Sequence, residues 1–249
     1  MTQSTSPSEE QVGKAYRKRK VKRRVFELLS NYRYSMPALN GLDRKLERFI
    51  VAHLDGKPGF FIEAGANDGY TQSNTFYFAR KYGWRGILIE PIPELAAHCE
   101  LIRPESTVVR CALGSASAQG ESVMLHRAGL MSTIEGAIGD ENSQRDHLER
   151  ASQLQPGIAM GAIEASVRAL SSIIDEHCPS GSIDFFSLDV EGYEPQVLSG
   201  LDFSKHRPRF ICVESRNDDA ISEALDEHYR FVDQLSHHDL LYEVKGLKA

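Results

Sequence analysis

Acidic and glycine residues gather at the end of an apolar run in the first third of the chain. Residues 61–69 read Phe-Ile-Glu-Ala-Gly-Ala-Asn-Asp-Gly, which predicts a strand leading into a glycine-rich turn. Glycine lets a backbone turn tightly and approach a ligand closely. Gly65 and Gly69 follow neither the Gly-Lys-Ser/Thr pattern of phosphate-binding loops nor the GxGxxG pattern of dinucleotide sites. A tight turn without a ligand is the alternative interpretation of these glycines.

The acids in and before this turn indicate the charge of a ligand. Glu63 and Asp68 would repel a pyrophosphate, and they favour a ligand with an ammonium group and a cationic sulfur. S-adenosylmethionine fits that description better than NAD.

A second apolar run, Ile87-Leu88-Ile89, ends in Glu90, 21 residues after Gly69. In nucleotide-binding βαβ units, an acid at the end of the second strand accepts hydrogen bonds from the ribose hydroxyls. An acid at the end of a surface strand is the alternative. The turn and the acid at this spacing together favour a nucleoside cofactor.

A third apolar run, residues 184–190, delivers Asp189 to its carboxyl end, with Glu191 just beyond it. Ligands of open α/β sheets bind outside the carboxyl ends of the strands, so both acids are expected in one crevice with Glu63 and Glu90. A carboxylate there can accept a proton from a hydroxyl, or bind a divalent cation with Asp189 and Glu191 as ligands. For Glu191, capping of the following helix is the alternative.

The elements that position these residues alternate from Gly59 onward, which predicts an α/β fold with a parallel sheet covered by helices. The expected strands are 59–64, 86–90, 107–113, 122–126, 166–170, 184–190, 210–214, 229–234 and 240–244. The expected helices are 42–53, 73–82, 93–102 and 195–201. A polar, glycine-containing segment at 132–164 is expected to cover the site.

The first 54 residues differ from the rest in charge. Eight Lys or Arg residues lie between Lys14 and Arg24, and with two preceding acids the first 24 residues carry +6, which leaves −12 on the remainder. We expect residues 1–54 to form a basic, partly disordered and helical N-terminal extension. Its basic stretch predicts either a solvated helix face or contact with the anionic inner face of a membrane.

Composition excludes several classes of protein. At 249 residues and 41% hydrophobic content, the chain can bury the core of one large α/β domain. Its four cysteines form no CxxC pair, which removes the usual zinc and thioredoxin patterns. Its acidic body argues against nucleic acid as a substrate. The absence of a signal-peptide pattern and of a long apolar stretch predicts a cytoplasmic protein.

The motifs together resemble those of the FkbM family of methyltransferases. The matching stretches are residues 61–69, 73–75, 83–91, 112–114 and 184–194, with Gly200 and Glu214 beyond them. The resemblance implies a Rossmann-like seven-stranded class I methyltransferase domain over 55–249, whose last strand is antiparallel. It implies S-adenosylmethionine as cofactor and O-methylation, often of a sugar or polyketide hydroxyl in glycolipids and secondary metabolites.

The resemblance also assigns site residues. The methionine end would contact Glu63, Gly65, Ala66, Asn67 and Gly69, the ribose Glu90 beside Pro91, and the adenine Cys111 and Ala112. The transferred methyl would lie near Asp189 and Glu191. Independently of the resemblance, the candidate bases for the acceptor hydroxyl are Asp189 first and Glu191 second, with His126, which ends an apolar run, as an alternative. The expected partner is a small-molecule or glycolipid acceptor. Two other functions stay open: methylation of a non-sugar metabolite, and a non-catalytic binding module.

Overall fold

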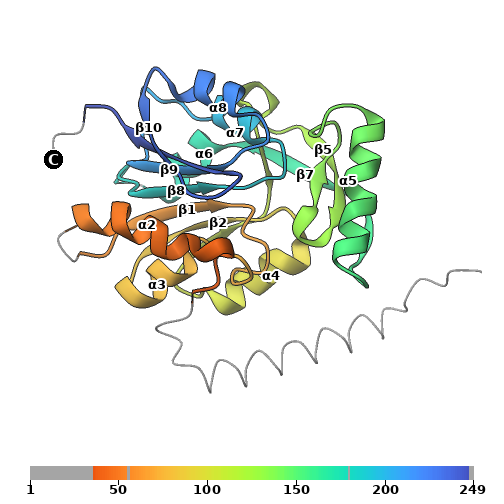
Figure 1. Ribbon diagram of the computed structural model, residues 1–249, viewed down its shortest axis with the longest axis horizontal. Coiled ribbons are helices and arrows are strands. Elements are labelled where there is room, and N and C mark those ends of the chain that lie inside the picture. The colour runs from red at the N-terminus through yellow and green to blue at the C-terminus, as the bar shows by residue number, and fades with distance from the viewer. Residues whose placement is uncertain (1–35, 55–56, 179, 247–249) are drawn as a thin grey trace, which may run out of the picture. The chain divides into compact units, whose positions relative to one another are not determined.

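The computed structural model describes residues 36–54, 57–178 and 180–246. Its main sheet has the strand order β3-β2-β1-β8-β9-β11-β10, in which five strands are parallel and β11 is antiparallel to both of its neighbours (Figure 1). The strands are β1 (Phe60–Ala64), β2 (Arg85–Ile89), β3 (Thr107–Val109), β8 (Phe185–Leu188), β9 (Phe210–Glu214), β10 (Tyr229–Gln234) and β11 (Asp239–Val244). The seven-stranded Rossmann-like fold expected from the sequence is confirmed.

Helices cover both faces of this sheet, which explains why its central strands are continuously apolar. Below it in Figure 1 lie α2 (Leu42–Ile50), α3 (Phe76–Tyr82) and α4 (Pro93–Ile102), which share a buried cluster with Phe61 and Leu88. Above it lie α6 (Leu170–His177), α7 (Glu194–Ser199) and α8 (Asp218–Leu225), which pack with Ile62 and Ile87. Successive residues of β1 therefore pack into core clusters on opposite faces of the sheet.

A second, four-stranded sheet extends from the edge of the first. Its order is β4 (Ala112–Gly114), β7 (Met160–Ala169), β5 (Ser122–Ala128) and β6 (Thr133–Ile134). A single strand over 107–113 was the wrong prediction, because the chain leaves the main sheet after Val109 and pairs next with β7. The strand expected at 166–170 is the end of the longer β7, and Leu170 already begins α6.

The 14-residue helix α5 (Glu141–Leu154) lies beside this second sheet and has no counterpart among the predicted elements. Asp140 caps it by accepting a hydrogen bond from the backbone N–H of Ser143. Its buried residues are Gln144, His147 and Ala151. Two of the three are polar, so the helix lacks the apolar stripe by which amphipathic helices are recognised in a sequence.

Other elements lie close to their predicted positions. The helix expected at 42–53 is α2 followed by the 3-10 turn η3 (Val51–His53), and α4, β9 and β10 have the predicted bounds. Helices α6 and α8 were not expected. The basic stretch from Lys14 to Arg24 and the predicted disorder at 1–13 lie outside the described residues. In the part of the chain that is described, no helix combines the length and apolar character needed to cross a membrane.

The turns after β1 and β8 approach each other more closely than side chains would permit. Gly65 has a φ of +78°, and a Cβ built on it would lie 1.8 Å from the carbonyl oxygen of Asp189. Backbone N–H groups of Gly65 and Ala66 both donate to the carbonyl of Ile89 at 3.1 Å. Gly65 therefore fixes the turn after β1 between the ends of β2 and β8.

Gly65→Ala is expected to destabilise the protein more than Gly83→Ala. Both glycines have positive φ, but a Cβ on Gly83 meets nothing within 4 Å. Left-handed backbone alone costs alanine about 1–2 kcal/mol, and the clash at Gly65 adds about 1–3 kcal/mol. Urea unfolding of both variants measures the difference, and equal losses of stability would contradict the close approach.

Candidate active site

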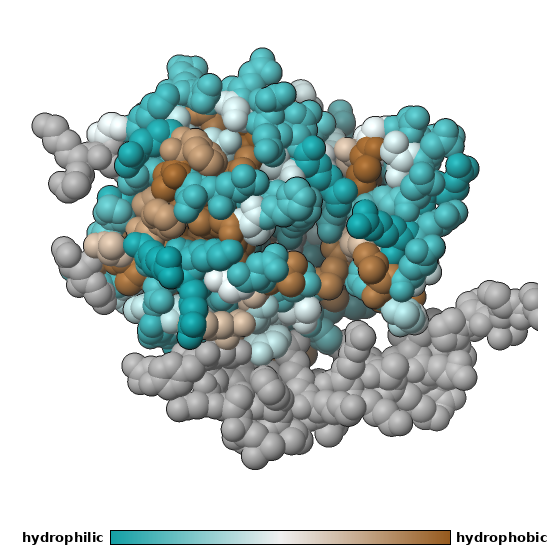
Figure 2. Space-filling view, viewed as in Figure 1, coloured by the Kyte–Doolittle hydropathy of each residue, from teal (hydrophilic) through white to brown (hydrophobic). Residues whose placement is uncertain are grey.

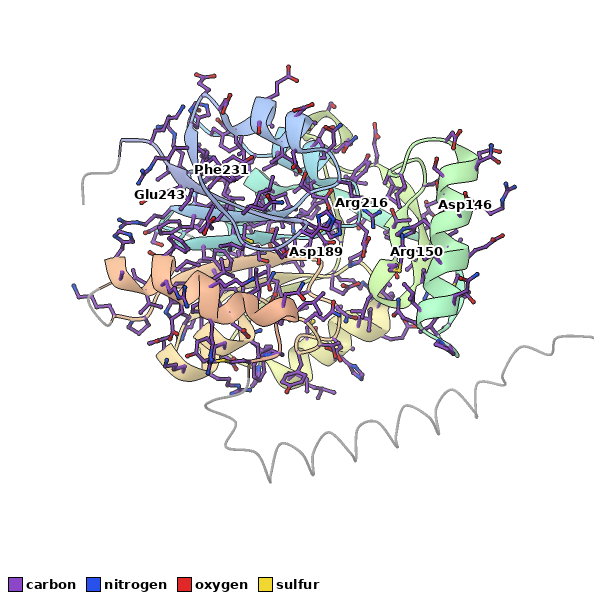
Figure 3. The ribbon with its side chains drawn as sticks, in the orientation of Figure 1. Asp146, Arg150, Asp189, Arg216, Phe231 and Glu243 are labelled. Atoms are coloured by element: carbon purple, nitrogen blue, oxygen red, sulfur yellow. The ribbon has the colours of Figure 1, made fainter. Side chains whose placement is uncertain are left out.

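A cavity of about 780 Å³ opens at the carboxyl ends of β1, β2 and β8. Its lining comes from the turns after these strands, from β4 and β5, and from α5 on the opposite side. Asp189 and Arg216 lie on the main-sheet side in Figure 3, and Arg150 and Asp146 lie on α5. A recess with apolar residues at its edge separates these two parts of the surface in Figure 2.

Almost all the residues singled out from the sequence line this cavity. They are Glu63, Gly65, Ala66, Asn67, Glu90, Pro91, Cys111, Ala112, Asp189 and Glu191. Gly69 is not among the lining residues; its φ is +77°, and a Cβ on it would lie 3.1 Å from the Cα of Cys99. Gly69 thus permits the close packing of the turn against α4. His126 does not line the cavity either, and its buried Nε2 has no hydrogen-bond partner in the described structure.

The Glu63 carboxylate orders the chain that follows the glycine-rich turn. It accepts hydrogen bonds from Ser73 Oγ at 2.9 Å, the backbone N–H of Asn74 at 2.8 Å and Thr75 Oγ1 at 2.6 Å. Asn74 Nδ2 in turn donates to Ser187 Oγ at 3.0 Å. Glu63 is therefore held by three donors of its own chain and carries its negative charge to the wall of the cavity.

A buried arginine stands behind Glu63 and was not singled out from the sequence. Arg103 has no exposed surface; its Nη1 lies 3.9 Å from Glu63 Oε2, and its guanidinium stacks over the ring of Phe61 with 5.0 Å to the centroid. It also donates to Thr75 Oγ1 at 3.3 Å. A lone basic residue after a helix carries no sequence signal for this role, because its partners come from the turn after β1.

Glu90 lies at the end of β2 and is 5% exposed. Its two carboxylate oxygens accept one backbone hydrogen bond each, from Asn67 at 2.8 Å and from Ile92 at 2.9 Å. Each oxygen keeps a further lone pair for a ligand hydroxyl. Burial raises the pKa of Glu90 to about 8, against the two hydrogen bonds, which lower it.

Asp189 and Glu214 form a carboxyl pair at the ends of β8 and β9. Burial, followed by the charge of Glu214, raises the pKa of Asp189 well above its usual range. A neighbouring carboxylate disfavours the charged form of Asp189, which adds to the effect of burial. Glu214 could have been inferred from the sequence by the argument applied to Asp189, because it also ends an apolar strand.

Glu191 is held from two sides in a left-handed conformation, with a φ of 57°. Its carboxylate forms an ion pair with Arg216, and its carbonyl accepts a hydrogen bond from Thr133 Oγ1 at 2.9 Å. Burial and then the charge of Glu214 raise the pKa of Glu191 to about 7, although Arg216 opposes the shift. Thr133 belongs to the cover segment, so Glu191 connects that segment to the main sheet.

Capping of the turn before α7 is performed by Glu194 and not by Glu191. The Glu194 carboxylate accepts hydrogen bonds from the backbone N–H groups of Val190 at 3.0 Å and Gly192 at 3.1 Å. The Glu191 side chain is thereby left for the cavity. Among the described residues, no group of three or more His, Cys, Asp or Glu side chains is arranged to bind a metal ion.

The strand order and the position of the cavity define the fold as that of a class I methyltransferase. Residues 63–244 match the family model described as the methyltransferase FkbM domain. The chain belongs to this family of methyltransferases, as its motifs suggested. No curated protein matches the sequence.

Solved structures with a similar arrangement share little sequence with this chain. An FkbM methyltransferase from Methylobacillus flagellatus KT is 17% identical with a TM-score of 0.44; the match covers 75% of this chain and 43% of that one. This chain thus spans less than half the length of that relative. A TehB-like SAM-dependent methyltransferase from Corynebacterium glutamicum is 10% identical with a TM-score of 0.41, over 93% of this chain and 99% of that one.

The stability of the ligand-free protein is expected to fall as the pH rises through about 8. The pKa of Glu90 is about 8 in the folded chain, above its ordinary value of 4.5, so its contribution is complete below 4.5 and is lost above 8. Between pH 6 and pH 9, the unfolding temperature should therefore fall less steeply with pH in Glu90→Gln than in the unaltered protein. Glu149→Gln, at an exposed position of α5, is the control. The same pH dependence in Glu90→Gln and Glu149→Gln would contradict the raised pKa of Glu90.

Proposed function

We propose that the protein transfers a methyl group from S-adenosylmethionine to a hydroxyl of a sugar in a glycolipid, polysaccharide or secondary metabolite. The observation that carries this proposal is the common cavity shared by Glu90 and the Asp189–Glu214 pair. Glu90 can accept hydrogen bonds from ribose hydroxyls, and the Asp189–Glu214 pair at the ends of the neighbouring strands can accept a proton. When bound, S-adenosylmethionine supplies a methyl group on a cationic sulfur.

The residues around β1 and β2 fit this cofactor. The cavity volume of about 780 Å³ falls in the range of small-molecule sites, about 300–1,000 Å³. The lone pairs left on Glu90 can accept from two ribose hydroxyls, and apolar side chains of Ile89, Cys111 and Leu113 line the wall beside it. Gly65 leaves the backbone of its turn open to the cavity, and the charge of Glu63 behind that turn favours a cationic ligand.

The carboxylates at the ends of β8 and β9 support transfer to oxygen. A sugar hydroxyl becomes a good nucleophile only as its proton leaves, and a base works best when its pKa lies near the operating pH. The pKa of Glu191, about 7, meets that requirement, and the pKa of Asp189 is raised in the same direction. Arg216 forms an ion pair with Glu191 and thereby fixes the orientation of that carboxylate.

The cavity also has apolar walls suited to a lipid or polyketide portion of an acceptor. Leu39 and Leu154 line it while remaining 55% and 64% exposed, which places apolar surface where an acceptor would enter. A small-molecule or glycolipid acceptor agrees with this lining. The same carboxylates would also accept a proton from a non-sugar hydroxyl.

Calorimetric binding of S-adenosylhomocysteine is expected to weaken by about tenfold or more in Glu90→Ala, about 1.4 kcal/mol, because two ribose hydrogen bonds are lost. Glu100→Ala, at an exposed position of α4, is the matched control and should bind as the unaltered protein does. Absence of binding to the unaltered protein would refute the cofactor assignment.

Asp189→Asn is expected to lower the turnover number for methyl transfer to glycolipid extracts by about 100-fold or more, since the amide cannot accept the proton. Binding of S-adenosylhomocysteine should change little, because Asp189 is assigned to the acceptor. Glu164→Gln, an exposed carboxyl on β7 outside the cavity, is the control. Full turnover in Asp189→Asn would move the role of base to Glu191, and a parallel assay with a chelator tests for a metal.

A further inference from the structure

A basic cluster lines the part of the cavity between the main sheet and α5, and the proposed reaction uses only the ion pair that one of its members forms with Glu191. The cluster consists of Arg150 and His147 from α5 and Arg216 from the loop after β9. All three line the cavity, together with Asp146 one turn before Arg150. In Figure 3, Arg216 and Arg150 are seen on the two sides of the space between the main sheet and α5.

The positive charges of Arg150 and Arg216 both act on the His147 side chain. Its ring is 6% exposed, and its Nε2 lies 2.8 Å from the carbonyl oxygen of Met131, which fixes its position. Burial lowers the pKa of His147, and the positive charges of Arg216 and Arg150 lower it further. Two arginines that are far apart in the sequence therefore direct positive charge at one region of the cavity wall.

The two arginines differ in their partners. Arg216 is paired with Glu191. Within the described part of the chain, no carboxylate lies within ion-pair distance of Arg150, and Asp146 on the preceding turn forms no pair with it. Arg150 thus brings a positive charge to the cavity that the described residues do not compensate through an ion pair.

We propose that Arg150 and Arg216 form a subsite for an oxyanion of the acceptor, so that the methylated molecule carries a carboxylate or a phosphate near its reacting hydroxyl. The planar guanidinium donates two parallel hydrogen bonds to either group, which fixes orientation as well as charge. The inference rests on the proposed methyltransferase function, and it specifies the class of acceptor that this site takes.

The acids nearby do not oppose such a ligand as strongly as their number suggests. Burial and the charge of Glu214 raise the pKa of Asp189, so Asp189 carries its negative charge less readily than an exposed carboxyl does. The charge of Glu191 is compensated by its ion pair with Arg216, which engages Nη2 and leaves the other N–H groups of that guanidinium as donors for an oxyanion. An anionic acceptor can therefore lie against Arg150 with its hydroxyl directed toward Asp189.

Calorimetry on the protein saturated with S-adenosylhomocysteine tests the subsite with three probes. These are methyl β-glucuronide for a carboxylate, glucose 6-phosphate for a phosphate, and methyl β-glucoside as the neutral sugar. We expect at least one anionic probe to bind tenfold or more tightly than the neutral one. The tighter of the two anionic probes identifies the source of the oxyanion.

Arg150→Ala should remove this preference, whereas Arg145→Ala should retain it. Arg145 lies on the same helix, contacts Asn142 and does not line the cavity. Equal binding of charged and neutral probes to the unaltered protein would overturn the inference, as would equal effects of the two substitutions. Binding of S-adenosylhomocysteine is measured in every variant. Its loss from the unaltered protein would refute the proposed function, and its retention without anion preference would refute the subsite alone.

Discussion

The contact between the turn after β1 and the end of β8 sets the geometry of the site. A side chain at Gly65 would overlap the carbonyl oxygen of Asp189, so the two turns can meet only through bare backbone. The same turn is tied to β2 by hydrogen bonds to Ile89. Three strand ends thereby converge, and the side chains that follow them, Glu63, Glu90 and Asp189, share one cavity.

The buried carboxyl groups at the β1 end and at the β8 end of this cavity have different neighbours. At the β1 end, Glu63 is surrounded by hydrogen-bond donors and faces the buried guanidinium of Arg103. At the β8 end, Asp189 and Glu191 lie near Glu214, and burial together with these neighbouring charges raises the pKa values of Asp189 and Glu191. The first arrangement suits recognition of a fixed positive charge, and the second suits uptake of a proton.

The second sheet and α5 supply the side of the cavity that the main sheet leaves open. They are joined to the acid cluster by the hydrogen bond from Thr133 to the carbonyl of Glu191, so the cover and the proposed bases are mechanically connected. Helix α5 exposes polar side chains to the cavity and buries Gln144 and His147 beneath them. Recognition of the acceptor is accordingly assigned to a segment outside the sheet motifs.

The sequence by itself determined the elements whose signals are local. Apolar runs ending in acids located β1, β2 and β8, and because parallel strands bring their carboxyl ends to one edge, they also placed Glu63, Glu90, Asp189 and Glu191 together. Only the tertiary structure decided where the run 107–113 divides between two sheets, since strand pairing depends on a distant partner in β7. It alone also revealed the polar helix α5, whose stability comes from packing and not from apolar periodicity.

The same distinction separates the residues of the site. Strand-end acids are visible in the sequence because the strand that carries them is visible. Arg103, Arg150 and Arg216 acquire their roles from neighbours on other elements, which no spacing along the chain records. The chain therefore specifies its family and the strand-end side of the cavity locally, whereas the side that we propose to bind the acceptor is formed only where separate elements meet in space.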